Sequence, residues 1–334
     1  MKTQVAVVKN GEAYDLVKRA LGLINVRARV GPQSKVFIKP NLPRVPPTSP
    51  YINEQGAYES TLAPEGDIVH REVIEALLRF LGEIGVKDVT IGEAAGGSET
   101  PIVYKSLGLY ELADKYGAEL VDLNYADSQK IEIPDSLVLK HIWVPKVLLE
   151  SDFLINLPTL KVHGFTGVTL SLKNWGIGIL PGKYYGINKT GRYKKGIEGP
   201  LPIHQYGTRK AEQGQEISSS QVIVDVCSAI KTHLNVVDGL TAVHYAPGAR
   251  QFLSKTLVER TNMIIAGYDM VATDSVCSRI LGFKPDKILH IKWAAERGIG
   301  VCDLSEIEVL GERVEHIEMR CNPLEQQVKF IRVD

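Results

Sequence analysis

The stretch PTLKVHGFTGVTLSLKNWGIG, residues 158–178, follows an apolar run at 153–157 and places basic side chains, a histidine and glycines in one short span. The apolar run predicts a buried strand that leads directly into it. Lys161 and His163 are two residues apart, so on an extended segment they point to the same side. Lys173 and Asn174 follow, just before another glycine. This mixture of residues is typical of a surface that binds and transforms a small anion.

Short β-branched runs alternate with segments of helical periodicity around this stretch. Alternation of this kind predicts a largely parallel sheet that is covered by helices on both faces. We therefore expect an α/β fold with a mostly parallel, mixed sheet. The predicted strands lie at 5–8, 35–39, 88–91, 120–123, 153–157, 234–237, 263–266 and 307–310, and the main predicted helices at 14–23, 67–84, 222–230, 270–281 and 288–297.

The clearest helical pattern covers residues 67–84, where apolar residues recur at helical spacing. Asp67 is the expected N-cap and Gly85 the expected stop signal. His70 then falls in the first turn of this helix. A second cap is expected at Asp269, before the helix at 270–281.

Two long irregular segments interrupt the pattern. Residues 42–66 contain five prolines, which indicates a stiff covering loop. Residues 181–216 contain seven Lys or Arg against three Glu, which fits either a solvated face or a basic, lid-like loop. We expect both loops to cover one edge of the sheet. The chain as a whole, 1–334, is expected to form a single large α/β domain, with a division into two lobes as the alternative.

The composition excludes several classes of protein. The formal net charge is zero, which argues against a nucleic-acid binder with a strongly basic surface. No apolar run approaches the length of a membrane span and the N-terminus lacks signal-peptide features, so we expect a cytoplasmic protein without a membrane partner. The four cysteines show neither CxxC pairs nor a tight cluster, which argues against a zinc or iron–sulfur site. Nothing in the sequence indicates the oligomeric state.

Polar residues repeatedly follow the predicted strands. The carboxyl ends of parallel strands meet at one edge of a sheet, where ligands usually bind, so these residues predict a single site. The expected catalytic residues are Lys161, His163 and His70, because imidazole and buried lysine are suited to proton transfer. The expected substrate-binding residues are Lys39, Asn41, Lys173, Asn174 and His204.

Acidic residues that follow two of the strands, together with one on the second turn of the helix at 270–281, suggest a second use of the site. Glu93, Asp238 and Asp274 are candidate oxygen ligands for a divalent metal ion. His70, His163 and an acid are an alternative ligand set for a transition metal. The alternative for the lysines is a buried ion-pair network with these same acids. The sequence contains no dinucleotide fingerprint, Walker loop or nucleophile elbow.

Five segments carry a resemblance to a known family: IKPNL at 38–42, the histidine-containing start of the 67–84 helix, the 158–178 stretch, VVDGL at 236–240 and YDMVATDSVCSRILG at 268–282. In this order they resemble the uncharacterised family "domain of unknown function 362". Members are often described as putative iron–sulfur proteins because many carry a ferredoxin-like cysteine module. This chain lacks such a module, so the resemblance implies a family and site positions but not a cluster.

The function expected from these observations is an enzyme acting on a small anionic metabolite, a carboxylate or phosphate ester. Proton-transfer chemistry of the isomerase, racemase or lyase type is preferred, because no nucleophile motif is visible, and a divalent metal is a candidate assistant. One alternative is a non-catalytic protein that binds or handles a metal or an iron–sulfur cluster. A second alternative is nucleotide or nucleic-acid binding through the 181–216 loop.

Overall fold

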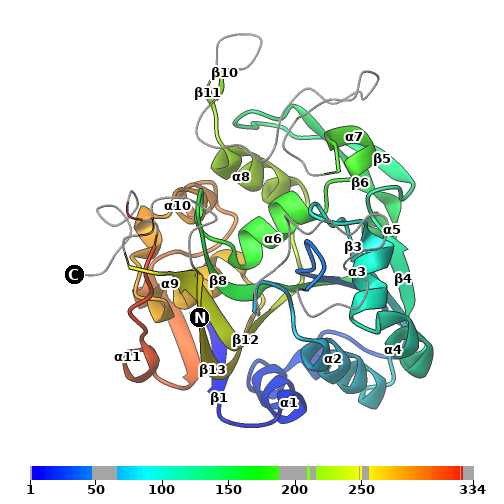
Figure 1. Ribbon diagram of the computed structural model, residues 1–334, viewed down its shortest axis with the longest axis horizontal. Helices are drawn as coiled ribbons and strands as arrows, with labels where there is room; N and C mark the ends of the chain where they lie inside the picture. The colour runs from blue at the N-terminus through cyan, green and yellow to red at the C-terminus, as the bar shows by residue number, and fades with distance from the viewer. Residues whose placement is uncertain are drawn as a thin grey trace.

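A ten-stranded sheet organises the chain (Figure 1). The computed structural model describes residues 2–46, 66–187, 209–210, 216–247, 249, 256–323 and 325. The strand order along the sheet is β14 (Ile307–Gly311), β1 (Thr3–Lys9), β13 (Thr256–Gly267), β12 (Leu234–Tyr245), β7 (Phe153–Leu157), β2 (Lys35–Pro40), β3 (Asp88–Glu93) and β4 (Glu119–Asp122). β13 runs antiparallel to both of its neighbours, and the other pairings along this order are parallel.

Helices cover both faces of this sheet, as predicted. On β1, Val5 and Val7 belong to one apolar cluster and Ala6 and Val8 to the other, as expected for a strand buried on both sides. One cluster includes side chains from α1 (Ala13–Leu23), α2 (Arg71–Glu83), α3 (Thr100–Ser106) and α4 (Leu109–Tyr116). The other includes side chains from α5 (Lys146–Leu149), α6 (Leu170–Gly178), α8 (Ser219–Ala229), α9 (Met270–Ile280), α10 (Leu289–Glu296) and α11 (Val314–Ile317).

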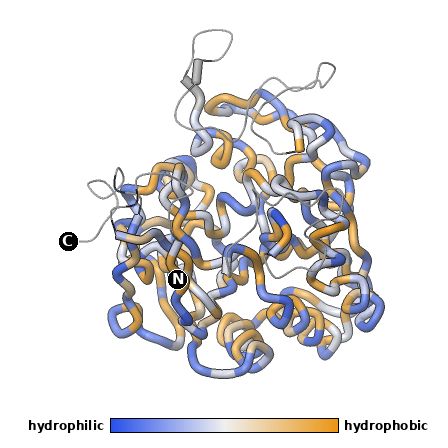
Figure 2. The backbone as a smooth tube through the Cα atoms, in the orientation of Figure 1, coloured by the Kyte–Doolittle hydropathy of each residue, from blue (hydrophilic) through white to orange (hydrophobic). Residues whose placement is uncertain are grey.

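Smaller elements complete the described chain. β5 (Ser128–Glu132) and β6 (His141–Pro145) form an antiparallel pair, and so do β10 (Arg209–Lys210) and β11 (Glu216–Ile217). Short 3-10 turns lie at Val26–Ala28, Pro285–Lys287 and Leu304–Glu306, and α7 spans Gly182–Tyr185. Figure 2 shows hydrophilic segments at many of the outer turns and hydrophobic ones along the central strands. The predicted covering loops lie largely outside the described residues, which omit 47–65, 188–208 and 211–215.

The pairing with β2 ends at Pro158, between β7 and β8. β7 pairs with β2, and Asn41 N still donates to Leu157 O at 2.9 Å. β8 (Thr159–His163) instead pairs with the outer half of β12, and also with β9 (Gly167–Val168). The carboxyl end of β2 therefore lies apart from β8. The segment 66–70 lies between them and is hydrogen-bonded to both sides.

Two local predictions are wrong. α2 begins at Arg71 with His70 in the N-cap position, so Asp67 does not cap this helix. Asp238 does not end a strand, because β12 continues to Tyr245 past a register shift between Gly239 and Thr241. Asp67 and Asp238 instead contact residues far away in the sequence, Lys161 and His70 respectively.

Candidate functional site

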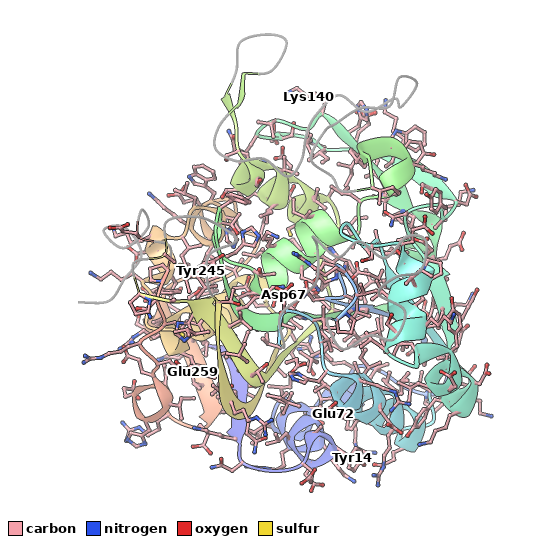
Figure 3. The ribbon with its side chains drawn as sticks, in the orientation of Figure 1. Tyr14, Asp67, Glu72, Lys140, Tyr245 and Glu259 are labelled. Carbon is pink, nitrogen blue, oxygen red and sulfur yellow. The ribbon has the colours of Figure 1, made fainter. Side chains whose placement is uncertain are left out.

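Lys161 and Asp67 form a buried ion pair near the middle of the molecule, and Figure 3 shows Asp67 just below α6. The Lys161 Nζ atom lies 2.8 Å from Asp67 Oδ1 and 2.7 Å from the main-chain oxygen of Asp67. Asn41 Nδ2 donates to the same main-chain oxygen at 2.7 Å. Arg44 Nε lies 3.5 Å from the second carboxylate oxygen, Oδ2. Lys161 and Asn41, which the sequence predicts for one site, therefore lie close together and share a hydrogen-bond partner.

The pKa values of Lys161 and Asp67 are both lowered. Burial lowers the pKa of Lys161, and Arg44 lowers it further, while Asp67 opposes both. Burial acts to raise the pKa of Asp67, but the charges of Lys161, Arg44 and Lys173 outweigh it and hold that pKa below its usual value. Asp67 therefore stays ionised. Lys161 is less strongly basic than an exposed lysine, which suits a group that gives and takes protons.

His70 and Asp238 form a second pair at the same edge of the sheet. The Nδ1 atom of His70 lies 2.8 Å from Asp238 Oδ2, and the main-chain N–H of His70 donates to the same oxygen at 2.7 Å. The side chain of Asp238 is fully buried, whereas that of His70 is 20% exposed. A carboxylate at Nδ1 favours the proton on that nitrogen, which leaves Nε2 as the basic atom of neutral His70.

His163 has the opposite arrangement. Its Nδ1 accepts a hydrogen bond from the main-chain N–H of Phe165 at 3.2 Å, so the proton of the neutral ring lies on Nε2. The ring is buried and contacts the Phe165 ring edge-on. His163 and Lys161 lie on β8, where alternate residues point to the same side, so the predicted relationship between them holds.

Lys39, Glu93 and Asn174 form a separate, closed network. The side chain of Lys39 is 1% exposed, and its ammonium donates to Glu93 Oε1 at 2.8 Å, to Pro40 O at 2.9 Å and to Asn174 Oδ1 at 3.3 Å. An ammonium has three protons, so these bonds use all of them. Asn174 in turn donates to Asn156 Oδ1 at 2.8 Å, and Asn156 donates to Asn235 Oδ1 at 3.1 Å. Lys39 and Asn174 thus belong to a buried network of the kind given above as the alternative, and substrate binding by these two residues stays a prediction.

The predicted metal ligands have separate partners. Glu93 accepts from Lys39 and from the main-chain N–H groups of Leu42 and Ala94. Asp238 holds His70. Asp274 accepts from Ser171 N and Leu172 N at the start of α6, and burial raises its pKa to about 7. Within the described residues there is no group of three or more His, Cys, Asp or Glu side chains that could hold a metal ion. The ligand set Glu93, Asp238 and Asp274 is therefore not assembled.

The cysteines do not fit an iron–sulfur cluster either. Cys227, Cys277 and Cys321 are buried and Cys302 is partly buried, and none of them belongs to a group of three or more potential metal ligands among the described residues. Burial raises the pKa of the Cys227 and Cys277 thiols well above its ordinary value, and the charge of Asp274 adds to this effect. Cluster ligands must be thiolates, so these two residues are placed where ligation is unfavourable.

Lys173 lies within electrostatic range of the Asp67 group. Its charge contributes to the lowered pKa of Asp67 and to that of His290 on α10. His290 is fully buried, burial is the main cause that lowers its pKa to about 3, and its ring nitrogens have no hydrogen-bond partner in the described part of the chain. Lys173 therefore remains a candidate binding residue. His204, the last predicted substrate-binding residue, lies outside the described residues.

Three further residues of the candidate site are not predicted by the sequence. The sequence predicts Asp67 as a helix cap, and Arg44 lies in the proline-rich segment, where no periodicity indicates its neighbours. Tyr245 is buried, and burial raises the pKa of its hydroxyl, an effect that the nearby charge of Asp67 reinforces. A hydrogen bond from the main chain at Gly164, next to His163, acts in the other direction. Figure 3 shows Tyr245 to the left of Asp67 in this view.

The described helices include none that is both long and apolar enough to span a membrane.

Comparison with known proteins shows the family to which the chain belongs. No curated protein matches the chain. The solved structure of the lactate racemase apoprotein from Thermoanaerobacterium thermosaccharolyticum is similar over 84% of this chain and 57% of that chain, with 14% sequence identity and a TM-score of 0.45. This chain thus covers little more than half of that protein, and at this score the similarity supports no statement about activity. The model of the family described as "Domain of unknown function (DUF362)" matches residues 36–279, and the chain belongs to this family.

Proposed function

We propose that this protein is an enzyme that binds a small anionic metabolite and moves protons on it, as an isomerase, racemase or lyase does. The observation that carries the proposal is the buried Lys161–Asp67 pair, whose Lys161 has a lowered pKa. Perturbed lysines of this kind are concentrated at functional sites. The His70–Asp238 pair follows Asp67 by three residues on the same connecting segment, so two proton-handling groups lie on one edge of the sheet.

The two histidines favour a division of roles. Asp238 orients His70 so that Nε2 is its basic atom, which suits a general base. His163 has its Nδ1 occupied by the Phe165 N–H, so Nε2 carries a proton and suits a hydrogen-bond donor to a substrate oxygen on which negative charge develops. Lys161 lies on the same side of β8 as His163, and its ammonium is the second proton-transfer group. Abstraction of a proton by one group and its return by another is the chemistry of a two-base racemisation.

Positive charge supports an anionic substrate. Lys161, Arg44 and Lys173 all act on the single carboxylate of Asp67, so basic groups are concentrated there. A carboxylate or phosphate held by such groups would place the neighbouring carbon close to the proton-transfer residues. Tyr245, which burial keeps protonated, is a further neutral donor in this region.

The test is hydrogen exchange at carbon, because proton-transfer enzymes wash solvent deuterium into their substrates. The purified chain is incubated in D₂O with panels of small carboxylates and phosphate esters, and proton NMR follows loss of the C–H signal. We expect at least one compound to exchange, and Lys161→Met and His70→Gln to slow that exchange by about 10²-fold or more. The control is Lys146→Met, which removes an exposed lysine paired with Asp127 on the surface. Exchange at the wild-type rate in both site variants would disprove the assigned roles.

A further inference from the structure

The carboxylate of Asp67 is surrounded by basic groups but is incompletely bonded. Lys161 donates to Oδ1 at 2.8 Å, whereas Arg44 Nε lies 3.5 Å from Oδ2. Both Oδ2 and the Arg44 Nε atom are shielded from solvent, and neither has a hydrogen-bond partner among the described residues. Buried charged atoms normally find such partners, so this pair is an exception that needs an explanation.

Local backbone structure does not explain why an aspartate is present. Asp67 lies in a bend before α2 and does not cap it, since His70 holds the N-cap position. Gly66 before it has a φ of +80°, a conformation that disfavours other residues. The main-chain oxygen of Asp67 is held independently by Lys161 and Asn41, each at 2.7 Å. The segment therefore stays anchored if the Asp67 side chain rotates away from Lys161 and Arg44.

We propose that Lys161, Arg44 and Lys173 form a binding centre for the carboxylate of a ligand, and that the Asp67 side chain is an intramolecular occupant which this ligand displaces. The centre already holds a planar group with two oxygens: an ammonium contacts one oxygen and a guanidinium lies beside the other. This arrangement matches a carboxylate, for which a guanidinium is well shaped. Lys173 adds long-range attraction. The inference deepens the proposed function by choosing carboxylates over phosphate esters.

Displacement has a measurable consequence, because Asp67 competes with the ligand. Removing the charge of Asp67 weakens the competitor, and removing its carboxylate altogether also leaves space. The affinity for a small carboxylate is therefore expected to rise from wild type to Asp67→Asn and again to Asp67→Ala. We expect an increase on the order of tenfold for Asp67→Asn.

The experiment measures binding of formate and acetate to the full chain by thermal shift at constant ionic strength, with chloride as the balancing anion. The matched control is Asp127→Ala, which removes an exposed aspartate 2.7 Å from Lys146. This variant should bind acetate no better than wild type. Adding Arg44→Met to Asp67→Asn should abolish the gain, because the second oxygen then loses its cation. Asp67→Asn conserves size, so it keeps the test valid if Asp67→Ala does not fold.

Three results would overturn the inference: no gain in affinity in Asp67→Asn, an equal gain in Asp127→Ala, or stronger binding of inorganic phosphate than of acetate to the Asp67 variants. None of these measurements requires turnover. A negative deuterium-exchange assay would therefore leave this binding centre standing, and failure to bind acetate would leave the proton-transfer assignment standing for other anions.

Discussion

Asp238 holds His70 through two hydrogen bonds to one atom: the main-chain N–H and the ring Nδ1 of His70 both bond to Asp238 Oδ2, at 2.7 and 2.8 Å. The main-chain bond holds His70 at the N-cap position of α2, and the ring bond favours the tautomer with the proton on Nδ1. The remaining oxygen, Oδ1, accepts from Leu240 N at 3.1 Å. The position and the protonation pattern of His70 are therefore set by the same buried carboxylate.

This relationship predicts the effect of Asp238→Asn. The amide oxygen in the place of Oδ2 can still accept both bonds from His70, so the fold and the tautomer of the ring should be retained. The negative charge beside the ring is lost, so the protonated ring that a general base forms is stabilised less, and the rate of proton exchange into the substrate should fall by about tenfold or more. Nitrogen NMR of the His70 ring checks that the tautomer is unchanged. An unchanged rate would contradict the role given to Asp238.

A second prediction concerns the buried Lys39–Glu93 pair. Glu93→Gln leaves the Lys39 ammonium without a counter-charge in a fully buried position. The free energy of unfolding should fall by about 3–5 kcal/mol, as measured by urea denaturation. The double variant Lys39→Met with Glu93→Gln should recover part of this loss, because no unpaired charge remains.

The matched comparison for this pair lies on the surface. Lys146 and Asp127 are as close, at 2.7 Å, but are exposed to solvent. Asp127→Asn should change the free energy of unfolding by less than about 1 kcal/mol. Equal losses in Glu93→Gln and Asp127→Asn would show that burial of the Lys39–Glu93 pair has no special effect.

A third prediction concerns the pH dependence that Asp274 contributes. Burial raises its pKa to about 7 from an ordinary value of 3.8, so the folded state holds this proton more tightly than the unfolded state. Stability from this group is fully present below about pH 4 and is lost as the pH rises through about 7. Between about pH 4 and pH 7, the free energy of unfolding of wild type should therefore fall by roughly 1–4 kcal/mol relative to that of Asp274→Asn. A pH-independent difference would contradict the raised pKa.

A fourth prediction uses two glycines. Gly66 has a φ of +80°, and a Cβ there would lie 2.3 Å from the Thr241 hydroxyl oxygen, so Gly66→Ala should destabilise the fold by more than about 1 kcal/mol. Gly22 lies in α1 with nothing within 4 Å of a built Cβ, so Gly22→Ala should stabilise it by about 0.5–1 kcal/mol. Thermal unfolding distinguishes the two. A neutral Gly66→Ala would mean that the bend before Asp67 is not constrained.

The fold class follows from local patterns in the sequence. Runs such as 153–157 are apolar along their whole length, which is the mark of strands buried on both faces, and the periodicity of 71–83 gives a helix. Lys39 and Glu93 lie near the carboxyl ends of the strands at 35–40 and 88–93, so the sequence also predicted that they meet at one edge of the sheet, where they do form an ion pair. The ends of helices are harder to place, because nothing in the sequence distinguishes an aspartate that caps a helix from one, such as Asp67, that pairs with a distant lysine.

The sequence by itself thus determined the α/β architecture, the edge of the sheet and the residue types gathered there. Only the tertiary structure decided the pairings: Asp67 with Lys161 across 94 residues, His70 with Asp238 across 168, and Lys39 with Glu93 across 54. The physical reason is that periodicity reports which face a residue occupies, whereas pairing depends on how strands and connections pack. Both lysines are buried, and their partners distinguish them: Lys39 has every proton bonded, whereas Lys161 shares the charge of Asp67 with Arg44 and Lys173.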